Sequence, residues 1–150
     1  RIHDPFIQKY MALEKERLDV AYMRECAQLF LGTHDFTSFT SAKIDARKPR
    51  IKTIYGLDIK EEDGFLRMSF IGNGFLRYMV RMLAQTLIEA GKHRLRKEEI
   101  RRMLESKDKQ ACRYKASPQG LYLVWVSYGG KEDESELSYA YHALSSCARQ

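Results

Sequence analysis

Two strand-like segments separated by only four residues restrict the fold of this chain more than any other feature. RIKTIYGLDIK (50–60) shows the alternation of a half-buried strand, with apolar or β-favouring side chains at Ile51, Thr53, Tyr55, Leu57 and Ile59. FLRMSFIG (65–72) follows the turn EEDG (61–64), in which Gly64 supplies the special backbone conformation. Strands joined so closely must be antiparallel, so the sequence predicts a β-hairpin.

Helical periodicity precedes the hairpin. LDVAYMRECAQLFL (18–31) carries apolar side chains at helical spacing, and Asp19 stands where a helix N-terminus favours an acid. GTHDFTSFTSA (32–42) holds too many small polar residues for a helix. We interpret it as an ordered loop whose Phe36 and Phe39 fill the core, although aromatic side chains in RNA-binding proteins also stack on bases.

Two further helices and a strand are predicted after the hairpin. The apolar stripe of residues 75–90 predicts a helix that stops at Gly91. KHRLRKEEIRRMLESKD (92–108) predicts another helix from about Lys97, and LYLVWVSY (121–128) predicts a strand that completes the sheet. The predicted fold class is α+β: an antiparallel sheet with helices packed on one face.

The net charge of +6 is unevenly distributed. Residues 129–150, a polar tail, contain two basic and four acidic side chains, so the first 128 residues carry +8. A basic body suits a polyanionic partner such as a nucleic acid, but charge alone does not separate that function from an ordinary basic surface.

Other functional classes are disfavoured by what the sequence lacks. Three cysteines without paired spacing (Cys26, Cys112, Cys147) predict reduced thiols and a cytoplasmic location. The four histidines show no metal-ligand spacing with cysteine or with each other, so we expect no zinc site. There is no apolar run of 18 residues and no signal-peptide pattern, so no membrane association is expected. The first residue is Arg1 rather than Met, which suggests a fragment or a processed chain.

Arg77 and Arg81 pose an electrostatic problem on the predicted 75–90 helix. One turn apart and without an acid four residues away, they repel by roughly 0.2–0.5 kcal/mol, and Arg77 opposes the helix dipole. A phosphate or a carboxylate from elsewhere would relieve both effects, whereas the alternative is a solvated helix face. The same two interpretations, phosphate contact or solvated face, remain open for a second basic cluster: Lys92, Arg94, Arg96 and Lys97.

Five blocks, taken in order, resemble the tRNA pseudouridine synthase A family, whose members isomerise uridines in the anticodon stem-loop of tRNA and work as homodimers. They are DPFIQKY, LDVAYMRECAQLFLGTHDFTSF, GNGFLRYMVRML, MLESKD and ASPQGLYLVWVSY. The family's Arg-Thr-Asp-x-Gly-Val-His segment, which contains the nucleophilic aspartate, does not occur. The resemblance therefore implies the family's C-terminal catalytic domain over residues 1–128, inactive alone, with an N-terminal half of the same enzyme and tRNA as partners.

The resemblance implies no cofactor and no metal, and it implies roles for individual residues. Arg81 ends the family's Phe-Leu-x-x-Met-Val-Arg motif, and the arginine there pairs with the nucleophilic aspartate and keeps it ionised. Phe75, Leu76 and Leu121 are expected to form apolar walls of the uracil pocket, and Arg77 is expected to face RNA phosphate. CRYKASPQGL departs from the family's Thr-Ala-Pro approach to Gly-Leu, which leaves the local contacts open. The alternatives are a non-catalytic RNA-binding domain and a dimerisation module.

Overall fold

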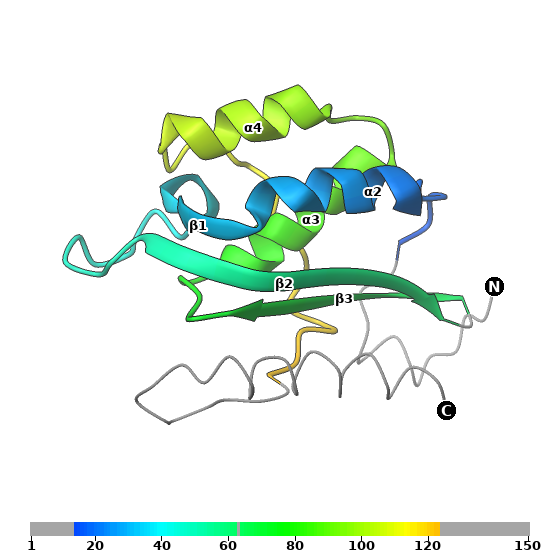
Figure 1. Ribbon diagram of the computed structural model, residues 1–150, viewed down its shortest axis with the longest axis horizontal. Helices are drawn as coiled ribbons and strands as arrows, with labels where there is room; N and C mark the ends of the chain where they lie inside the picture. Colours follow the sequence, from blue (N-terminus) through cyan, green and yellow to red (C-terminus); the bar gives the residue numbers. More distant parts are fainter. Residues whose placement is uncertain (1–13, 63, 124–150) are drawn as a thin grey trace.

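The computed structural model describes residues 14–62 and 64–123, which form a three-stranded antiparallel sheet with helices over one face (Figure 1). This is the α+β architecture predicted from the sequence. The described elements are α2 (Val20–Ala27), η1 (Gln28–Phe30), β1 (Gly32–Asp35), η2 (Thr37–Phe39), β2 (Ile51–Glu62), β3 (Phe65–Gly72), α3 (Met79–Gly91) and α4 (Lys97–Ser106).

The predicted hairpin is confirmed as β2 and β3. The two strands pair antiparallel, with Ile59 opposite Met68, and Gly64 in the turn has a φ of +84°. Strand β2 extends two residues beyond the predicted end at residue 60, because Glu62 still pairs with Phe65. The turn is therefore tighter than EEDG suggested.

The third described strand is not the predicted one. The segment 32–42, interpreted as a loop, contains strand β1 and the short 3₁₀ helix η2, because Gly32 to Asp35 pair with β2 and give the sheet order β1-β2-β3. Pairing with a neighbouring strand outweighs the low β propensity of this stretch. In the predicted strand 121–128, residues 121–123 are exposed and irregular, and residues 124–128 lie outside the described part. The tail at 129–150 also lies outside it.

Helix α2 begins where the sequence predicted and ends earlier. The Asp19 side chain accepts a hydrogen bond from the backbone N–H of Tyr22 at 3.1 Å and so caps the helix. The predicted helix over 18–31 divides into α2 and η1, whose Phe30 is fully buried. Phe36 and Phe39 are also fully buried, which confirms them as core residues.

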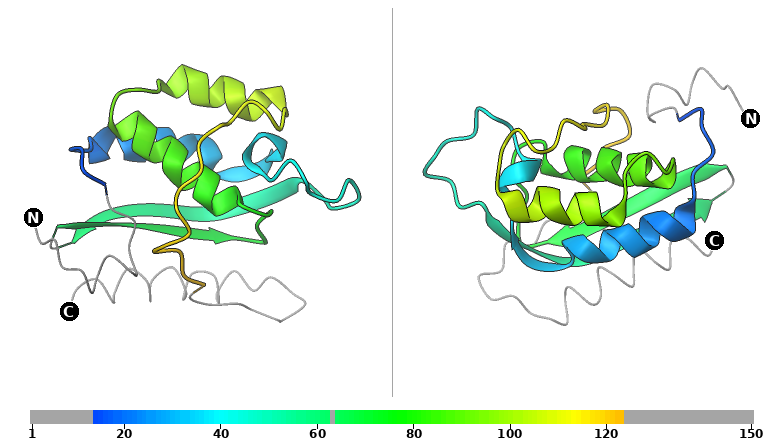
Figure 2. Two further views of the ribbon diagram at one scale, coloured as in Figure 1. Left: turned by 180° about the vertical axis from the view of Figure 1, so that it is seen from behind. Right: turned by 90° about the horizontal axis from the view of Figure 1, so that it is seen from above.

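Helices α2 and α3 lie side by side on one face of the sheet, and α4 lies farther from the sheet, above both of them (Figures 1 and 2). The two inner helices approach closely at Gly91, where an added Cβ would stand 2.7 Å from the sulfur of Met23. The N–H of Asp19 donates to the carbonyl of Gly91 at 2.8 Å. Close packing therefore accounts for glycine at the end of α3, the stop that the sequence predicted.

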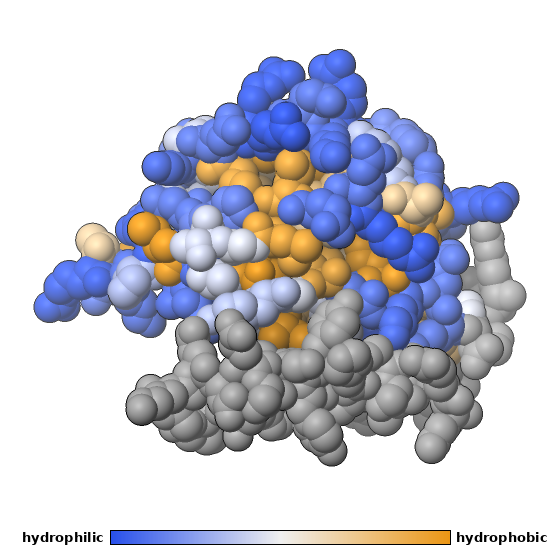
Figure 3. Space-filling model, viewed as in Figure 1, coloured by the Kyte–Doolittle hydropathy of each residue, from blue (hydrophilic) through white to orange (hydrophobic). Residues whose placement is uncertain are grey.

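The apolar core lies between this helical layer and the sheet. In Figure 3, apolar side chains are visible between the charged surfaces of the helices and the strands. The largest fully buried side chains include Met23, Phe30, Phe39, Ile54, Ile59, Met79, Leu83 and Leu87. Among the described helices, none is long and apolar enough to cross a lipid bilayer.

Candidate active site around Arg81

Residues 73–78 form the connector between β3 and α3. Contacts of Gly72 and Asn73 with strand β2 hold the start of this connector. A Cβ on Gly72 would stand 2.8 Å from the carbonyl oxygen of Thr53, which only glycine tolerates. Asn73 donates its N–H to that oxygen at 3.0 Å, and its side-chain oxygen accepts from the N–H of Thr53 at 2.9 Å. The connector is thus fastened to β2 on leaving β3.

The other end of the connector is fastened by residues 40 and 41. The carbonyl of Arg77 accepts hydrogen bonds from the N–H of Ser41 at 3.0 Å and from the hydroxyl of Thr40 at 3.1 Å. Both donor residues are buried, so water has little access to compete for these hydrogen bonds. The backbone at Arg77 is therefore held outside the helix.

Helix α3 begins at Met79, four residues later than predicted. Tyr78 has a φ of +65°, a left-handed conformation that costs a non-glycine residue roughly 1–2 kcal/mol and cannot continue a right-handed helix. The predicted 75–90 helix was wrong at its start because periodicity does not detect such a turn. Arg77 therefore precedes the helix, and the dipole argument applied to it does not hold.

Arg81, on the first turn of α3, is half-buried and held by the segment that follows α4. Its Nε donates to the carbonyl of Ala116 at 2.8 Å, and the N–H of Ala116 donates to the carbonyl of Arg81 at 3.0 Å. No described residue bonds to the two terminal nitrogens of the Arg81 guanidinium. As far as the described residues show, both nitrogens can bind a planar acceptor such as a carboxylate.

The ring of Tyr78 lies among three cations, which we call the Tyr78 cluster: Arg77, Arg81 and Lys115. The ring centroid is 4.8 Å from the guanidinium carbon of Arg77, 5.0 Å from that of Arg81 and 4.4 Å from Nζ of Lys115. Cations are attracted to the face of an aromatic ring, which offsets part of their mutual repulsion. Within the described residues, no carboxylate forms an ion pair with any of the three.

The phenol of Tyr78 is affected by the same cations. Arg77 Nη2 donates to its hydroxyl oxygen at 3.1 Å. This hydrogen bond and the positive charge of Arg77, with smaller contributions from Lys115 and Arg81, lower the pKa of Tyr78 below its usual value. The cluster is therefore a region of positive potential suited to an anion.

The three residues expected to form the apolar pocket lie in different environments. Leu76 is 7% exposed and belongs to the core. Phe75 is 40% exposed, and its ring packs against Gly72, where an added Cβ would stand 3.3 Å from it. Leu121 is 51% exposed. Phe75 and Leu121 thus offer apolar surface to a ligand, whereas Leu76 is part of the core.

Lys92, in the second basic cluster, is turned into the protein. Its side chain is 8% exposed, and Nζ lies 2.9 Å from Glu14, 3.5 Å from Glu89 and 3.9 Å from Glu16. Burial alone would lower the pKa of Lys92, but the hydrogen bond with Glu14 and the three carboxylate charges outweigh it and raise the pKa. Contact with an outside phosphate would require Lys92 to leave these carboxylates.

The other members of that cluster are more exposed but also paired. Arg94 lies 2.6 Å from Glu16, and Lys97 lies 3.5 Å from Glu25. Arg96 lies 3.7 Å from Glu99, which also accepts from the N–H of Arg96 at 2.7 Å and caps α4. The positive charge of this region is therefore largely balanced within the chain, unlike that of the Tyr78 cluster.

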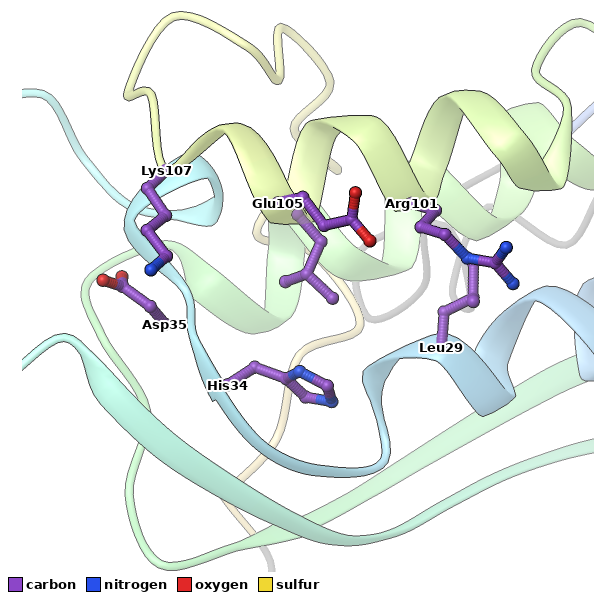
Figure 4. A pocket seen from close by; sticks show the side chains of 7 residues that line it. Leu29, His34, Asp35, Arg101, Glu105 and Lys107 are labelled. Carbon is purple, nitrogen blue, oxygen red and sulfur yellow. The ribbon is translucent and has the colours of Figure 1, made fainter.

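A separate pocket of about 250 Å³ lies between η1, β1 and α4 (Figure 4). Leu29, His34, Asp35, Arg101, Leu104, Glu105 and Lys107 line it, and none of these belongs to the Tyr78 cluster. Its His34 is engaged with the carbonyl of Leu31 at 2.7 Å, and Asp35 accepts from the N–H of Thr37 at 3.0 Å. No group of side chains in the described residues has the composition of a metal site.

The sequence comparisons agree with the family suggested by the five blocks. A profile described as tRNA pseudouridine synthase matches residues 26–129, so the chain belongs to the tRNA pseudouridine synthase family. The curated relatives named tRNA pseudouridine synthase A include proteins of Bacillus subtilis, 43% identical over 125 residues, and Listeria innocua, 42% identical over 130 residues. A tRNA pseudouridine synthase A 1 of Protochlamydia amoebophila is 38% identical over 130 residues.

These alignments cover most of this chain and about half of each relative. They span 83% of the chain and 50% of the Bacillus subtilis protein, 85% and 52% for Listeria innocua, and 85% and 51% for Protochlamydia amoebophila. The chain thus spans about half the length of the curated relatives it matches.

Sequence reasoning missed two members of the cluster, Tyr78 and Lys115. Tyr78 lay within an apparently continuous helical pattern. Lys115 lies in the segment that departs from the family's usual Thr-Ala-Pro approach, 34 residues after Arg81, and the hydrogen bonds between Ala116 and Arg81 hold this segment beside Tyr78. No spacing rule in the sequence could have identified it.

Proposed function

We propose that residues 1–128 are the C-terminal catalytic domain of a tRNA pseudouridine synthase that isomerises uridine in the anticodon stem-loop, with residues 129–150 as a polar tail. Family membership supports the reaction class. Conversion of uridine to pseudouridine exchanges an N1–C1′ bond for a C5–C1′ bond with no net change in atoms or electrons. The reaction therefore calls for no redox cofactor.

The proposed role of Arg81 is to pair with the nucleophilic aspartate of a preceding half of the same enzyme. The observation that carries this proposal is the half-buried guanidinium held through Nε by Ala116, with no carboxylate partner among the described residues. A cation so placed favours the charged form of an adjacent carboxyl group and fixes its direction. The chain alone would then lack the nucleophile and be inactive.

Substrate contacts are proposed for the neighbouring residues. Phe75 and Leu121 would cover the uracil with apolar surface, and Leu76 would support that wall through the core. Arg77 would face an RNA phosphate. Arg94, Arg96 and Lys97 would contribute weaker contacts, since each already has a carboxylate partner.

Two measurements test this proposal. The protein that contains this chain together with a preceding half is incubated with an unmodified tRNA transcript, and pseudouridine is mapped by carbodiimide-dependent reverse-transcription stops. We expect pseudouridine in the anticodon stem-loop, and none when residues 1–150 are assayed alone. Tight tRNA binding without isomerisation by the longer protein would instead support a non-catalytic RNA-binding domain, and multiple turnovers by the short chain would contradict the role given to the missing half.

A further inference from the structure

We propose that Lys115 and Arg77 together hold a single backbone phosphate of the RNA beside the Tyr78 ring. This inference rests on the proposed function and adds to it a binding residue, Lys115, that the family resemblance does not identify. The ligand class is a phosphodiester, which has one negative charge and oxygens that accept hydrogen bonds from ammonium and guanidinium groups alike.

The geometry brings the two cations to one place. Lys115 Nζ lies 4.4 Å and the Arg77 guanidinium carbon 4.8 Å from the same ring centroid, so both cations lie beside one ring. Both residues are exposed and open to a ligand. The hydroxyl oxygen of Tyr78 accepts one hydrogen bond from Arg77 Nη2, at 3.1 Å.

The position of Lys115 is tied to that of Arg81. The carbonyl of Ala116, the next residue, accepts a hydrogen bond from Arg81 Nε at 2.8 Å, and its N–H donates to the Arg81 carbonyl at 3.0 Å. The connector that carries Arg77 is held in turn by Thr40 and Ser41. A phosphate held by Lys115 and Arg77 would therefore lie at a defined distance from the guanidinium that we assign to the reaction.

The charge balance favours this surface over the second basic cluster. Lys92 and Arg94 are within ion-pair distance of glutamates at 2.9 and 2.6 Å. Arg77 and Lys115 have no carboxylate partner among the described residues. An anion that reaches the Tyr78 cluster gains attraction to cations that are not already neutralised, and it relieves their mutual repulsion.

The first test measures the salt dependence of tRNA binding. The longer protein and its Lys115→Gln, Arg77→Gln and double variants are compared at several KCl concentrations, with Arg102→Gln as the control because Arg102 is exposed on α4. Each phosphate contact contributes about 0.7–0.9 to the slope of log K against log salt. We expect each single variant to lose about that amount and the double variant to lose no more than either one.

Three outcomes would overturn the proposal: wild-type slopes in both single variants, an equal loss in Arg102→Gln, or a double variant that loses twice as much, which would indicate two separate phosphates. Thermal unfolding checks that the variants fold. The salt slopes are measured from binding alone, without the reaction. If the variants change the slope but the longer protein forms no pseudouridine, only the proposed function is contradicted. If the longer protein isomerises uridine normally but the variants leave the slope unchanged, only the phosphate site is contradicted.

A second test locates the phosphate. Stem-loop RNAs with one neutral methylphosphonate at each loop position in turn are bound by the wild-type protein and by Lys115→Gln. We expect one position where neutralisation weakens wild-type binding about tenfold or less and leaves Lys115→Gln unaffected. If the neutral linkage weakens both proteins equally at every position, Lys115 does not hold a phosphate.

Discussion

Arg81 and Ala116 hold each other through two hydrogen bonds that join the first turn of α3 to the segment after α4. Arg81 Nε donates to the Ala116 carbonyl at 2.8 Å, and the Ala116 N–H donates to the Arg81 carbonyl at 3.0 Å. The side chain that we assign to the reaction is therefore positioned by backbone atoms 35 residues away. Its terminal nitrogens have no partner among residues 14–62 and 64–123 and can bind a carboxylate.

This arrangement predicts that, in the longer protein with its preceding half, Arg81→Ala impairs catalysis far more than Arg77→Ala. Breaking a buried charge pair costs about 3–5 kcal/mol, and since Arg81 is half-buried we expect the lower end, roughly a hundredfold in rate. Arg77→Ala should mainly weaken tRNA affinity. Arg81→Lys should restore only part of the rate, because lysine lacks the bidentate fork. Single-turnover rates at saturating tRNA separate chemistry from binding, and equal rates for the two alanine variants would contradict the role of Arg81.

In the second basic cluster, we expect substitution of Lys92 to lower the stability of the fold and not the affinity for tRNA. Lys92→Gln leaves Glu14 and Glu89 without their buried cation, and we expect a loss of about 3 kcal/mol in the free energy of unfolding. Lys97→Gln is the matched control: its partner Glu25 is 59% exposed, so the loss should be below about 1 kcal/mol. Urea unfolding gives both values. A Lys92→Gln protein with normal stability and weakened tRNA binding would reverse this assignment.

The same ion pairs predict a dependence of stability on pH. Burial would raise the pKa of Glu14, but the N–H of Glu16 and the Lys92 ammonium outweigh it and hold the pKa below the usual value of 4.5. Because the folded-state pKa is depressed, the contribution of Glu14 is present above about pH 4.5 and is lost as the pH falls through the folded-state pKa. Thermal unfolding from pH 7 to pH 3 should show this loss, and Glu14→Gln should be less stable at pH 7 but decline less steeply. Parallel profiles would show that Glu14 is not coupled to folding.

The sequence predicted those features of the fold that depend on residues close together in the chain. The hairpin, the cap at Asp19 and the start of α4 at Lys97 depend on neighbouring residues, and each was predicted. The start of α3 was misplaced because the carbonyl of Arg77 is captured by Thr40, 37 residues earlier. Local signals cannot report such a contact.

The candidate site shows the same limit. Arg77 and Arg81 attracted attention because neither has an acid at helical spacing, and the described residues place no carboxylate beside them either. The structure places them differently from the sequence prediction, which put both on one helix face. Both guanidinium groups lie beside the ring of Tyr78, and Arg77 lies outside the helix. Two of the three partners of Lys92, Glu14 and Glu16, could not be predicted, because they lie more than 70 residues away in sequence.

Variants of Tyr78 distinguish a role of this residue in stability from a role in function. Tyr78→Phe keeps the ring beside Arg77, Arg81 and Lys115 and loses only the hydrogen bond from Arg77. Each cation–ring contact at an exposed site contributes about 0.5–1 kcal/mol, so the phenylalanine variant should keep its rate within about threefold. Tyr78→Leu removes the ring face and should lose more, in both tRNA affinity and single-turnover rate.

Tyr78→Gly completes this prediction, because it removes the ring and relieves the left-handed backbone together. Relief of the φ of +65° is worth roughly 1–2 kcal/mol, which offsets the greater flexibility of glycine in the unfolded chain, about 0.5–1 kcal/mol. We expect urea unfolding close to that of the wild type, with activity as low as in Tyr78→Leu. If the tyrosine served only the fold, activity would instead follow stability across all three variants, and Tyr78→Gly would be nearly as active as the wild type.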